Sequence, residues 1–313
     1  MTNNKILTVV DTSYFCYYII FGAVNEFVKR YSDDAKHWIK PAEEVDQQNL
    51  PNLLNCDSFR RVLKKMTMRR CEVIDWVMRQ NFQDDIDAAD RIDIIFAMDD
   101  RVSNSFRKRL YPDYKAQRAL TPKQFQIQPI KDYIINVIFK DLNVEEEHGY
   151  KIVKVDGAEG DDVIACIMRN YNDYMLKILF ASDKDFLQLD NVRQFGLDGK
   201  EVLRKVDKEI LSPNDFLLYK IIVGDGSDNI PKVFERVGCK KALKLIHDKD
   251  KLRADLKEKQ DSAKRFMLNK KLISFAEMPN ELVSTILEKV NEKLFEIENS
   301  SRTDFDFADF MNM

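Results

Sequence analysis

The sequence predicts an α/β fold with a mostly parallel central sheet and helices on both of its faces. Four short apolar runs support this prediction, at residues 6–10, 92–98, 151–155 and 176–181. Each run has strand length and is hydrophobic at nearly every position, which is typical of strands buried on both faces of a parallel sheet. The segments between the runs have helical periodicity, so strands and helices alternate along the chain.

The first two runs each lead directly into an aspartate. ILTVV is followed by Asp11, and IDIIFAM by Asp99. Between these runs we expect a long, mostly helical insertion, of which residues 57–80 are the clearest amphipathic part. Basic residues line this helix, and we interpret them as a solvated face, with contact to DNA as the alternative. They are Arg60, Arg61, Lys64, Lys65, Arg69 and Arg70.

The last two runs also end in acidic segments. KIVKV leads through Asp156 into GAEGDDVIACI at 157–167, and LKILFA is followed by Asp183. After residue 205 the strand pattern fades and helical patterns continue to the end. We therefore predict an α/β domain over 1–205, a helical lobe without its own sheet over 206–300, and a flexible tail over 301–313, in which phenylalanines alternate with Ser, Asp and Asn.

Composition narrows the class of protein. The 313 residues include 50 basic and 53 acidic ones, so a charged partner must be met by local patches rather than by the net charge of −3. The five cysteines form no CxxC pair, and the three histidines are too scattered for a zinc motif or a His-based triad. No apolar run approaches the roughly 18 residues of a membrane span. We expect a cytoplasmic, monomeric globular protein with reduced thiols.

Acidic residues gather where the predicted strands end. Because the carboxyl ends of parallel strands lie on one edge of a sheet, we expect these acids to converge. The set is Asp11, Asp99, Glu159, Asp161, Asp162, Asp183, Asp185, Asp225 and Asp228. Without counter-ions each close pair would repel by an amount on the order of kilocalories per mole. Oxygen ligands without thiolate or imidazole favour magnesium or manganese as the neutralising ions.

The number of acids indicates two ions. Magnesium keeps several of its waters, so seven or more carboxylates exceed the needs of one ion. Two such ions, about 4 Å apart, can activate a water and stabilise the leaving oxygen in phosphodiester cleavage. For any single acid, a turn or helix N-cap is the simpler interpretation. The joint pattern favours the metal site, because Asp183 and Asp185 share one side of an extended segment.

Residues 101–123 have the composition of a segment that binds single-stranded nucleic acid. They hold seven Lys or Arg against one acid, with Phe106, Tyr111 and Tyr114 interleaved. Basic side chains bind phosphates, and aromatic faces stack on unpaired bases. A merely solvated helix face would not call for the aromatic residues.

A second candidate for phosphate contact is the segment 224–246, which joins two helical patterns through a loop rich in Gly, Asp, Ser and Asn. Its glycines allow backbone amides to approach a phosphate. Lys240, Lys241 and Lys244 follow at the start of the next helix. The alternative is a helix-turn-helix with a purely structural purpose.

Five motifs in this order resemble those of the metal-dependent 5′ nucleases: VVDTSYF, FAMDD, GAEGDDVIA, ASDKDFLQL and GDGSDNIP. This family includes flap endonucleases, the 5′ nuclease domain of bacterial DNA polymerase I and phage 5′-3′ exonucleases, and the likeness covers about residues 5–250. Residues 265–287 also resemble the C-terminal part of the ribonuclease H of T-even-type phages, which removes RNA primers.

The resemblance implies a role for each acid. Asp11, Asp99, Glu159 and Asp161 correspond to the ligands of a first metal, and Asp183, Asp185 and Asp228 to those around a second. Asp162 and Asp225 correspond to water-mediated ligands. The implied cofactors are two Mg²⁺ ions, for which Mn²⁺ substitutes. Of the adjacent Asp99 and Asp100, we choose Asp99 because it directly ends the apolar run.

The resemblance also implies how nucleic acid is bound. Residues 101–135 correspond to a helical arch through which a single 5′ strand passes. Residues 218–246 correspond to a helix-three-turn-helix that grips duplex DNA and in several members binds K⁺. Arg107 and Lys108 would help to neutralise the reacting phosphate. Many relatives have an additional lysine three residues before this arginine, where this chain has Asn104. Lys108 or Lys115 would take the place of that lysine. The expected nucleic-acid contacts are Arg107, Lys108, Tyr111, Tyr114, Lys115, Arg118, Gly226, Ser227, Lys240, Lys241 and Lys244.

The sequence thus predicts a two-metal 5′-3′ exonuclease or flap endonuclease that acts on DNA and RNA–DNA duplexes in phage replication. Expected partners are a sliding clamp, bound through the tail DFADFMNM, and a single-strand DNA-binding protein. A PIN-like endoribonuclease and a magnesium phosphatase are alternatives, but neither explains the GDGSDN loop or the basic aromatic segment. A non-catalytic DNA junction binder is the alternative from another class, and it would tolerate gaps among the acids.

Overall fold

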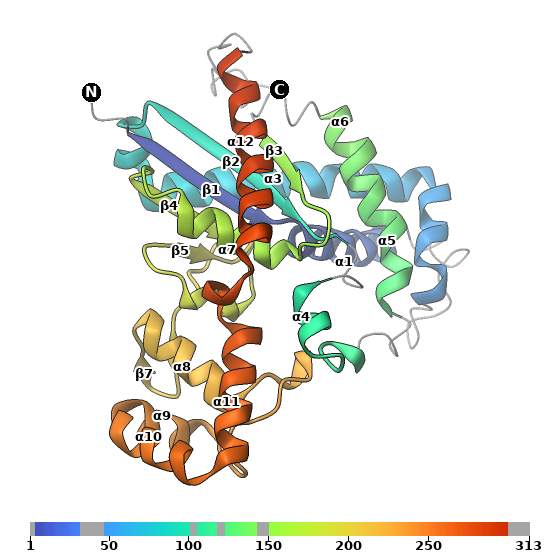
Figure 1. The fold of residues 1–313 in the computed structure, drawn as a ribbon. Coiled ribbons are helices and arrows are strands. Elements are labelled where there is room, and N and C mark those ends of the chain that lie inside the picture. The colour runs from blue at the N-terminus through green and yellow to red at the C-terminus, as the bar shows by residue number, and fades with distance from the viewer. Residues whose placement is uncertain (1–3, 32–46, 101–104, 118–122, 143–149, 300–313) are drawn as a thin grey trace.

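A five-stranded parallel sheet forms the centre of the fold (Figure 1). The computed structural model describes residues 4–31, 47–100, 105–117, 123–142 and 150–299. The sheet has the order β3-β2-β1-β4-β5. Its strands are β1 (Lys5–Asp11), β2 (Arg91–Met98), β3 (Tyr150–Lys154), β4 (Leu176–Phe180) and β5 (Arg193–Phe195). The predicted α/β class with a mostly parallel sheet is confirmed.

The register of the sheet explains why the apolar runs are continuous. Strand β1 pairs in parallel with both β2 and β4, so that Val9 lies opposite Ile95 on one side and Leu179 on the other. Successive side chains of a strand point to opposite faces. Ile6 and Val10 enter the core on one face, whereas Leu7 and Val9 enter the core on the other. Both faces are buried, and both therefore require apolar residues.

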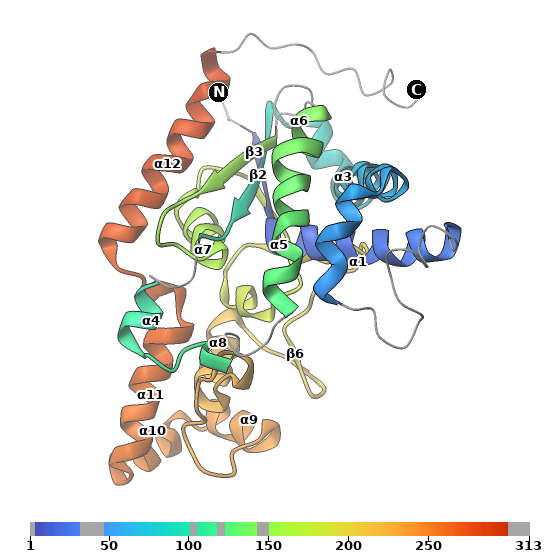
Figure 2. The same cartoon turned by 90° about the vertical axis from the view of Figure 1, so that its right-hand side faces the viewer.

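Helices cover both faces of the sheet (Figure 2). One face is covered by α1 (Thr12–Arg30), η1 (Gln47–Asn55), α3 (Asp57–Asp87), α5 (Lys123–Tyr133), the π-helical η4 (Ile134–Ile138) and α6 (Phe139–Asp141). The opposite face is covered by α7 (Gly160–Asn170) and α12 (Asn280–Asn299). The basic amphipathic segment predicted over 57–80 is thus most of helix α3.

A helical lobe lies beyond the sheet, at the bottom of Figure 1. Its elements are α8 (Pro213–Val223), η6 (Gly226–Asp228), α9 (Cys239–His247), α10 (Lys249–Glu258), α11 (Gln260–Ile273) and η7 (Phe275–Glu277). Buried residues such as Phe216, Ile222, Val233 and Leu245 give the lobe its own core. Helix α12 returns to the sheet, where Ile286 and Val290 pack with α7.

The sequence analysis did not predict the short strands. The three-residue β5 was missed, and so was a hairpin of two-residue strands, β6 (Lys205–Val206) and β7 (Glu209–Ile210), that precedes the lobe. Such short segments have no readable alternation, and β5 includes the polar Gln194, which is buried. Gln194 is held in place because its side chain donates to the carbonyls of Ala181 and Asp183.

The segment predicted to form an arch, 101–135, is described in part. It begins with the short helix α4 (Phe106–Leu110) and ends in α5. Ile127 and Ile130 of α5 are buried in the core beside α1, so this part packs against the sheet domain. Residues 101–104 and 118–122 lie outside the described residues, as does the tail from residue 300. In the part of the chain that is described, no helix combines the length and the apolar character needed to cross a membrane.

Candidate active site

Four aspartates meet at the carboxyl edge of the sheet, beside the point where the strand order reverses. Asp11 ends β1, Asp99 follows β2, Asp183 lies three residues after β4, and Asp161 is in the first turn of α7. We call these four residues the central acids. In an open parallel sheet the crevice at the reversal point is where ligands bind. Strands β1 and β4 lie side by side there.

Burial and mutual repulsion raise the pKa values of two of the central acids, Asp11 and Asp161. Burial, together with the charges of Asp99 and Asp183, raises the pKa of Asp11 to about 7, although the Tyr14 amide and Lys131 act in the opposite direction. The pKa of Asp161 is raised well above its usual value by burial and by the other three central acids, against the opposing effect of Lys115. The edge therefore concentrates negative charge that a cation would stabilise.

Local hydrogen bonds fix the direction of these carboxylates. Asp11 caps helix α1 by accepting from the Tyr14 amide at 3.0 Å. Asp99 accepts from the Gly160 amide at 2.7 Å and also from the Ser13 hydroxyl. The neighbouring Asp100 instead accepts from the Gly157 amide at 2.9 Å and pairs with Lys154. The structure thus brings Asp99 to the central acids and directs Asp100 toward β3.

A second group of acids lies next to the central ones, where helix α7 meets the loop at η6. Glu159 precedes α7, is buried, and accepts from the Lys115 ammonium and, at 3.3 Å, from the Tyr114 hydroxyl. That hydroxyl also lies 3.3 Å from Asp228. Burial alone would raise the pKa of Glu159, but Lys115 and Arg107 outweigh it and lower the pKa.

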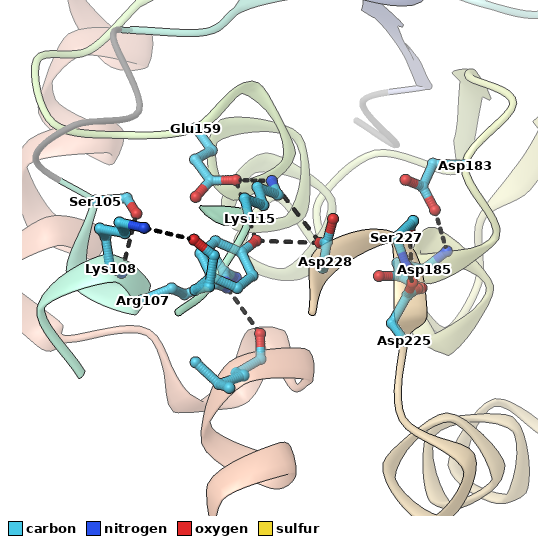
Figure 3. Close-up of polar contacts among 12 residues, drawn as sticks. Ser105, Arg107, Lys108, Lys115, Glu159, Asp183, Asp185, Asp225, Ser227 and Asp228 are labelled. Carbon is cyan, nitrogen blue, oxygen red and sulfur yellow. Dashed lines mark hydrogen bonds and ion pairs between the residues drawn. The ribbon is translucent and has the colours of Figure 1, made fainter. Parts of the chain in front are cut away.

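A third group consists of Asp185 and Asp225, which face each other across the start of the lobe (Figure 3). Lys220 of α8 lies between them, with its Nζ 2.7 Å from an oxygen of each carboxylate. Ser227 contributes its amide and hydroxyl to Asp225 at 2.8 and 2.5 Å. Burial alone would lower the pKa of Lys220, but its two carboxylate partners outweigh burial and raise it.

Asp162 and Arg107 form a buried ion pair away from the central acids. Their N–O distance is 2.6 Å, and both side chains are at most 3% exposed. Arg107 also donates to the carbonyl of Leu272 at 2.8 Å and lies over the rings of Phe106 and Phe275. In this structure Arg107 therefore joins α4 to α7 and to the end of α11, and its guanidinium does not face solvent.

The other expected nucleic-acid contacts differ in exposure. Gly226, Ser227, Lys240, Lys241 and Lys244 are exposed, and Lys108 and Tyr111 are half-buried. Tyr114 is buried, and the Lys115 side chain is only 9% exposed because it enters the acidic edge. Arg118 lies outside the described residues.

Three site residues were missed by sequence reasoning, namely Ser13, Lys131 and Lys220. Lys131 of α5 donates to the Ser13 hydroxyl at 2.9 Å, and Ser13 in turn donates to Asp99. Ser13 lies two residues after Asp11, in the first turn of α1, and this proximity was a usable signal. Lys131 had no such signal, because it is 118 residues from its partner. Lys220 lies about one helical turn before Asp225, and a search for lysines near the acidic motifs would have found it.

The donor set suits a hard divalent cation, because it consists of carboxylate oxygens. Glu159 Oε1 is buried and finds no hydrogen-bond partner among the described residues, as expected of an oxygen that awaits a cation. As the side chains stand, no three His, Cys, Asp or Glu side chains within the described ranges are arranged to hold a metal ion. Lys115 and Lys220 instead neutralise Glu159, Asp185 and Asp225.

Comparison with known proteins agrees with this geometry. Residues 76–214 match the family model of the 5′-3′ exonuclease N-terminal, resolvase-like domain. The chain is 32% identical over 162 residues to a 5′-3′ exonuclease of Buchnera aphidicola subsp. Schizaphis graminum, covering 50% of this chain and 52% of the relative. It is 34% identical over 161 residues to the thermostable DNA polymerase I of Thermus caldophilus, covering 49% of this chain and 18% of the polymerase. The chain thus spans about half the length of the curated exonuclease.

Solved structures share the fold at low identity. The 5′-exonuclease of T5 with bound divalent zinc ions superposes with a TM-score of 0.56 at 15% identity, covering 92% of this chain and 98% of that one. A T5 flap endonuclease in a pseudo-enzyme-product complex with DNA and metal ions gives a TM-score of 0.54 at 14% identity, with the same coverage. Residues 76–214 are therefore similar to the N-terminal domain of 5′-3′ exonucleases, and the fold is similar to that of the T5 5′-exonuclease.

Proposed function

We propose that this protein is a metal-dependent 5′ nuclease that hydrolyses phosphodiester bonds near the 5′ ends and at the 5′ flaps of DNA and RNA–DNA duplexes. The observation that carries the proposal is the meeting of Asp11, Asp99, Asp161 and Asp183 at one edge of the sheet, where burial and repulsion raise the pKa of Asp11 and Asp161. The curated relatives include 5′-3′ exonucleases, and a structural neighbour is a flap endonuclease bound to DNA.

The acids would hold two Mg²⁺ ions, with Mn²⁺ as a substitute. Bound divalent ions in the T5 5′-exonuclease support metal dependence. When bound, such ions would supply an activated water and stabilise the departing oxygen. We assign the first ion to Asp11, Asp99, Glu159 and Asp161, and the second to Asp183, Asp185 and Asp228, with Asp162 and Asp225 as outer, water-mediated partners. Ser13 donates to Asp99 and is itself held by Lys131, so these two residues orient the Asp99 carboxylate.

The basic residues of this chain would position the phosphate. Lys108 is half-buried on the short helix α4, where its ammonium donates to the carbonyl of Tyr114 at 2.9 Å. On leaving that neutral acceptor, the ammonium can turn to the charge that builds on a reacting phosphate. Arg107 would have to leave Asp162 and the Leu272 carbonyl to do the same. We therefore propose that Arg107 fixes the base of this segment while Lys108 contacts the phosphate.

Duplex DNA would lie against the loop after α8 and the start of α9. Gly226 and Ser227 are exposed there, and so are Lys240, Lys241 and Lys244 on the first turns of α9. Exposed amides and lysines at a helix start suit phosphates. We propose that residues 218–246 act as the helix-three-turn-helix of the family, with a K⁺ site in its loop.

The biological setting is a further part of the proposal. The resemblance to the phage ribonuclease H supports removal of RNA primers during phage DNA replication, in the cytoplasm of the host. The tail from residue 301 would bind a sliding clamp, and a single-strand DNA-binding protein would deliver the substrate. Removal of the residues after Ser301 should abolish stimulation by the clamp, and unchanged stimulation would exclude the tail as the contact.

The decisive experiment for the function is cleavage of a 5′-labelled flap duplex in Mg²⁺ and in EDTA. We expect short 5′ products in Mg²⁺ and intact substrate in EDTA. Binding of the flap duplex without cleavage in either Mg²⁺ or Mn²⁺ would contradict the proposal and would identify the protein as a junction binder. Comparison of flap, nicked and RNA-primed substrates would then define the preferred substrate.

A further inference from the structure

The most unusual contact at the acidic edge is that of Lys220 with two carboxylates at once. Its Nζ lies 2.7 Å from Asp185 Oδ1 and 2.7 Å from Asp225 Oδ2. All three side chains are between 16 and 21% exposed, so solvent screens them only in part. Asp183 adds a further negative charge, since its carboxylate accepts from the Asp185 amide at 2.8 Å. One ammonium thus faces two carboxylates, and a third lies beside Asp185.

We propose that Lys220 is a built-in cation that competes with a divalent metal ion for the Asp185–Asp225 carboxylates. The inference deepens the proposed function and rests on it, because it concerns the affinity of the same acids for metal. In the metal-free protein the ammonium supplies the positive charge that prevents the carboxylates from repelling one another. A divalent ion that binds these oxygens must displace the ammonium or tolerate its charge at close range.

The position of Lys220 makes displacement feasible. Lys220 lies near the end of helix α8, and its long flexible side chain can withdraw without movement of the backbone. The Asp225 carboxylate keeps its orientation without the lysine, because it still accepts hydrogen bonds from the amide and the hydroxyl of Ser227. The site would therefore survive the exchange of one cation for another. An arginine here would be harder to displace, since its planar fork can bind both carboxylates.

The inference predicts opposite effects of one substitution on stability and on metal affinity. Lys220→Met keeps most of the length of the side chain but removes its charge. In EDTA the variant should melt at a lower temperature than the wild type, because the carboxylates lose their counter-ion. In calorimetric titrations with Mg²⁺ or Ca²⁺ it should bind the metal about tenfold more tightly, since a competing positive charge is gone. Lys220→Arg should bind the metal more weakly than the wild type or at most equally, because its guanidinium is harder to displace.

The matched control is Lys249→Met. Lys249 lies in the same lobe, and its ion pair with Asp215 at 3.2 Å has a lysine side chain that is 57% exposed. This variant should leave both the melting temperature and the metal affinity unchanged. If Lys220→Met fails to fold in EDTA but folds in Mg²⁺, exchange of the two cations is supported. If it folds in neither, Lys220 is required for packing and the inference is wrong.

The failure of this inference can be told apart from failure of the proposed function. Equal or weaker metal affinity in Lys220→Met, with a wild-type protein that binds metal and cleaves flaps, would overturn the role of Lys220 alone. If the wild-type protein bound no divalent ion and cleaved no substrate, both proposals would fall. Calorimetry and melting need no turnover, so they read metal binding separately from catalysis.

Discussion

The guanidinium of Arg107 lies 2.6 Å from Asp162 Oδ1, and both side chains are at most 3% exposed. The same guanidinium reaches the carbonyl of Leu272 at 2.8 Å. One arginine therefore ties together the helix α4 that follows β2, the helix α7 that carries Asp161, and the end of the lobe helix α11. This contact thus joins the acidic edge to the lobe.

Loss of Arg107 should be costly to stability. Arg107→Met leaves the buried Asp162 carboxylate without its cationic partner, so we expect the free energy of unfolding to fall by about 3–5 kcal/mol. Urea unfolding followed by circular dichroism measures this change. The control is Arg253→Met, whose partner Asp250 is 92% exposed, and which should cost less than about 1 kcal/mol. Equal effects of the two substitutions would show that the buried pair adds nothing.

The stability of the metal-free protein should fall as pH rises from about 4 to 7. The pKa of Asp11 is raised to about 7 from a usual value of 3.8, so the folded protein retains a proton that the unfolded chain has lost over this range. Stability decreases with pH wherever the folded state binds more protons. Glu159 and Asp225, whose pKa values are lowered, act in the opposite direction only below about pH 4.5. Asp161, Asp162 and Asp185 also have raised pKa values and act in the same direction as Asp11, so a comparison with a variant at Asp11 is needed.

Asp11→Asn isolates this contribution, because asparagine can still cap helix α1. In EDTA the variant should gain stability over the wild type as pH rises, by about 1–3 kcal/mol between pH 5 and 8. Urea unfolding at the two pH values gives the difference. If the gain in stability did not increase with pH, burial and repulsion would not raise the pKa of Asp11 as the structure indicates.

The lysines at the start of α9 should contribute to binding rather than to turnover. Combined replacement of Lys240, Lys241 and Lys244 by alanine should weaken duplex binding and lower the slope of log K against log salt by up to about 3. The rate at saturating substrate should stay near that of the wild type. Fluorescence anisotropy over a salt series tests the slope, and an unchanged slope would place the duplex elsewhere.

Much of the sheet could be predicted because burial on both faces leaves a strong signal. The four apolar runs became β1 to β4 with ends displaced by at most one residue. Asp11, Asp99 and Asp183, at the ends of β1, β2 and β4, all act on Asp161. The strand β5 could not be predicted, because its three residues are too few to show an alternation of apolar and polar positions. The carboxyl ends of the long strands could therefore be predicted from the sequence, whereas the short outer strand β5 could not.

The partners of the acids were less accessible to sequence reasoning. Arg107 and Asp162 are 55 residues apart, and Lys115 and Glu159 are 44 apart, so no local pattern links them. Charge composition over 101–123 predicted contact with phosphate, yet it cannot show which basic residues turn inward. The fold brings Arg107 and Lys115 to acids, and leaves Lys240, Lys241 and Lys244 exposed.

The most direct test of the acidic edge is the uptake of manganese by the wild-type protein and by Asp161→Asn. Asp161 is the central acid whose pKa is influenced by the other three, so its loss should disturb the site most. The substitution preserves the shape of the side chain, and circular dichroism would show that the fold is intact. Titration followed by electron paramagnetic resonance should find about two bound ions per wild-type chain and at least one fewer in Asp161→Asn. Equal uptake by the two proteins would contradict the account.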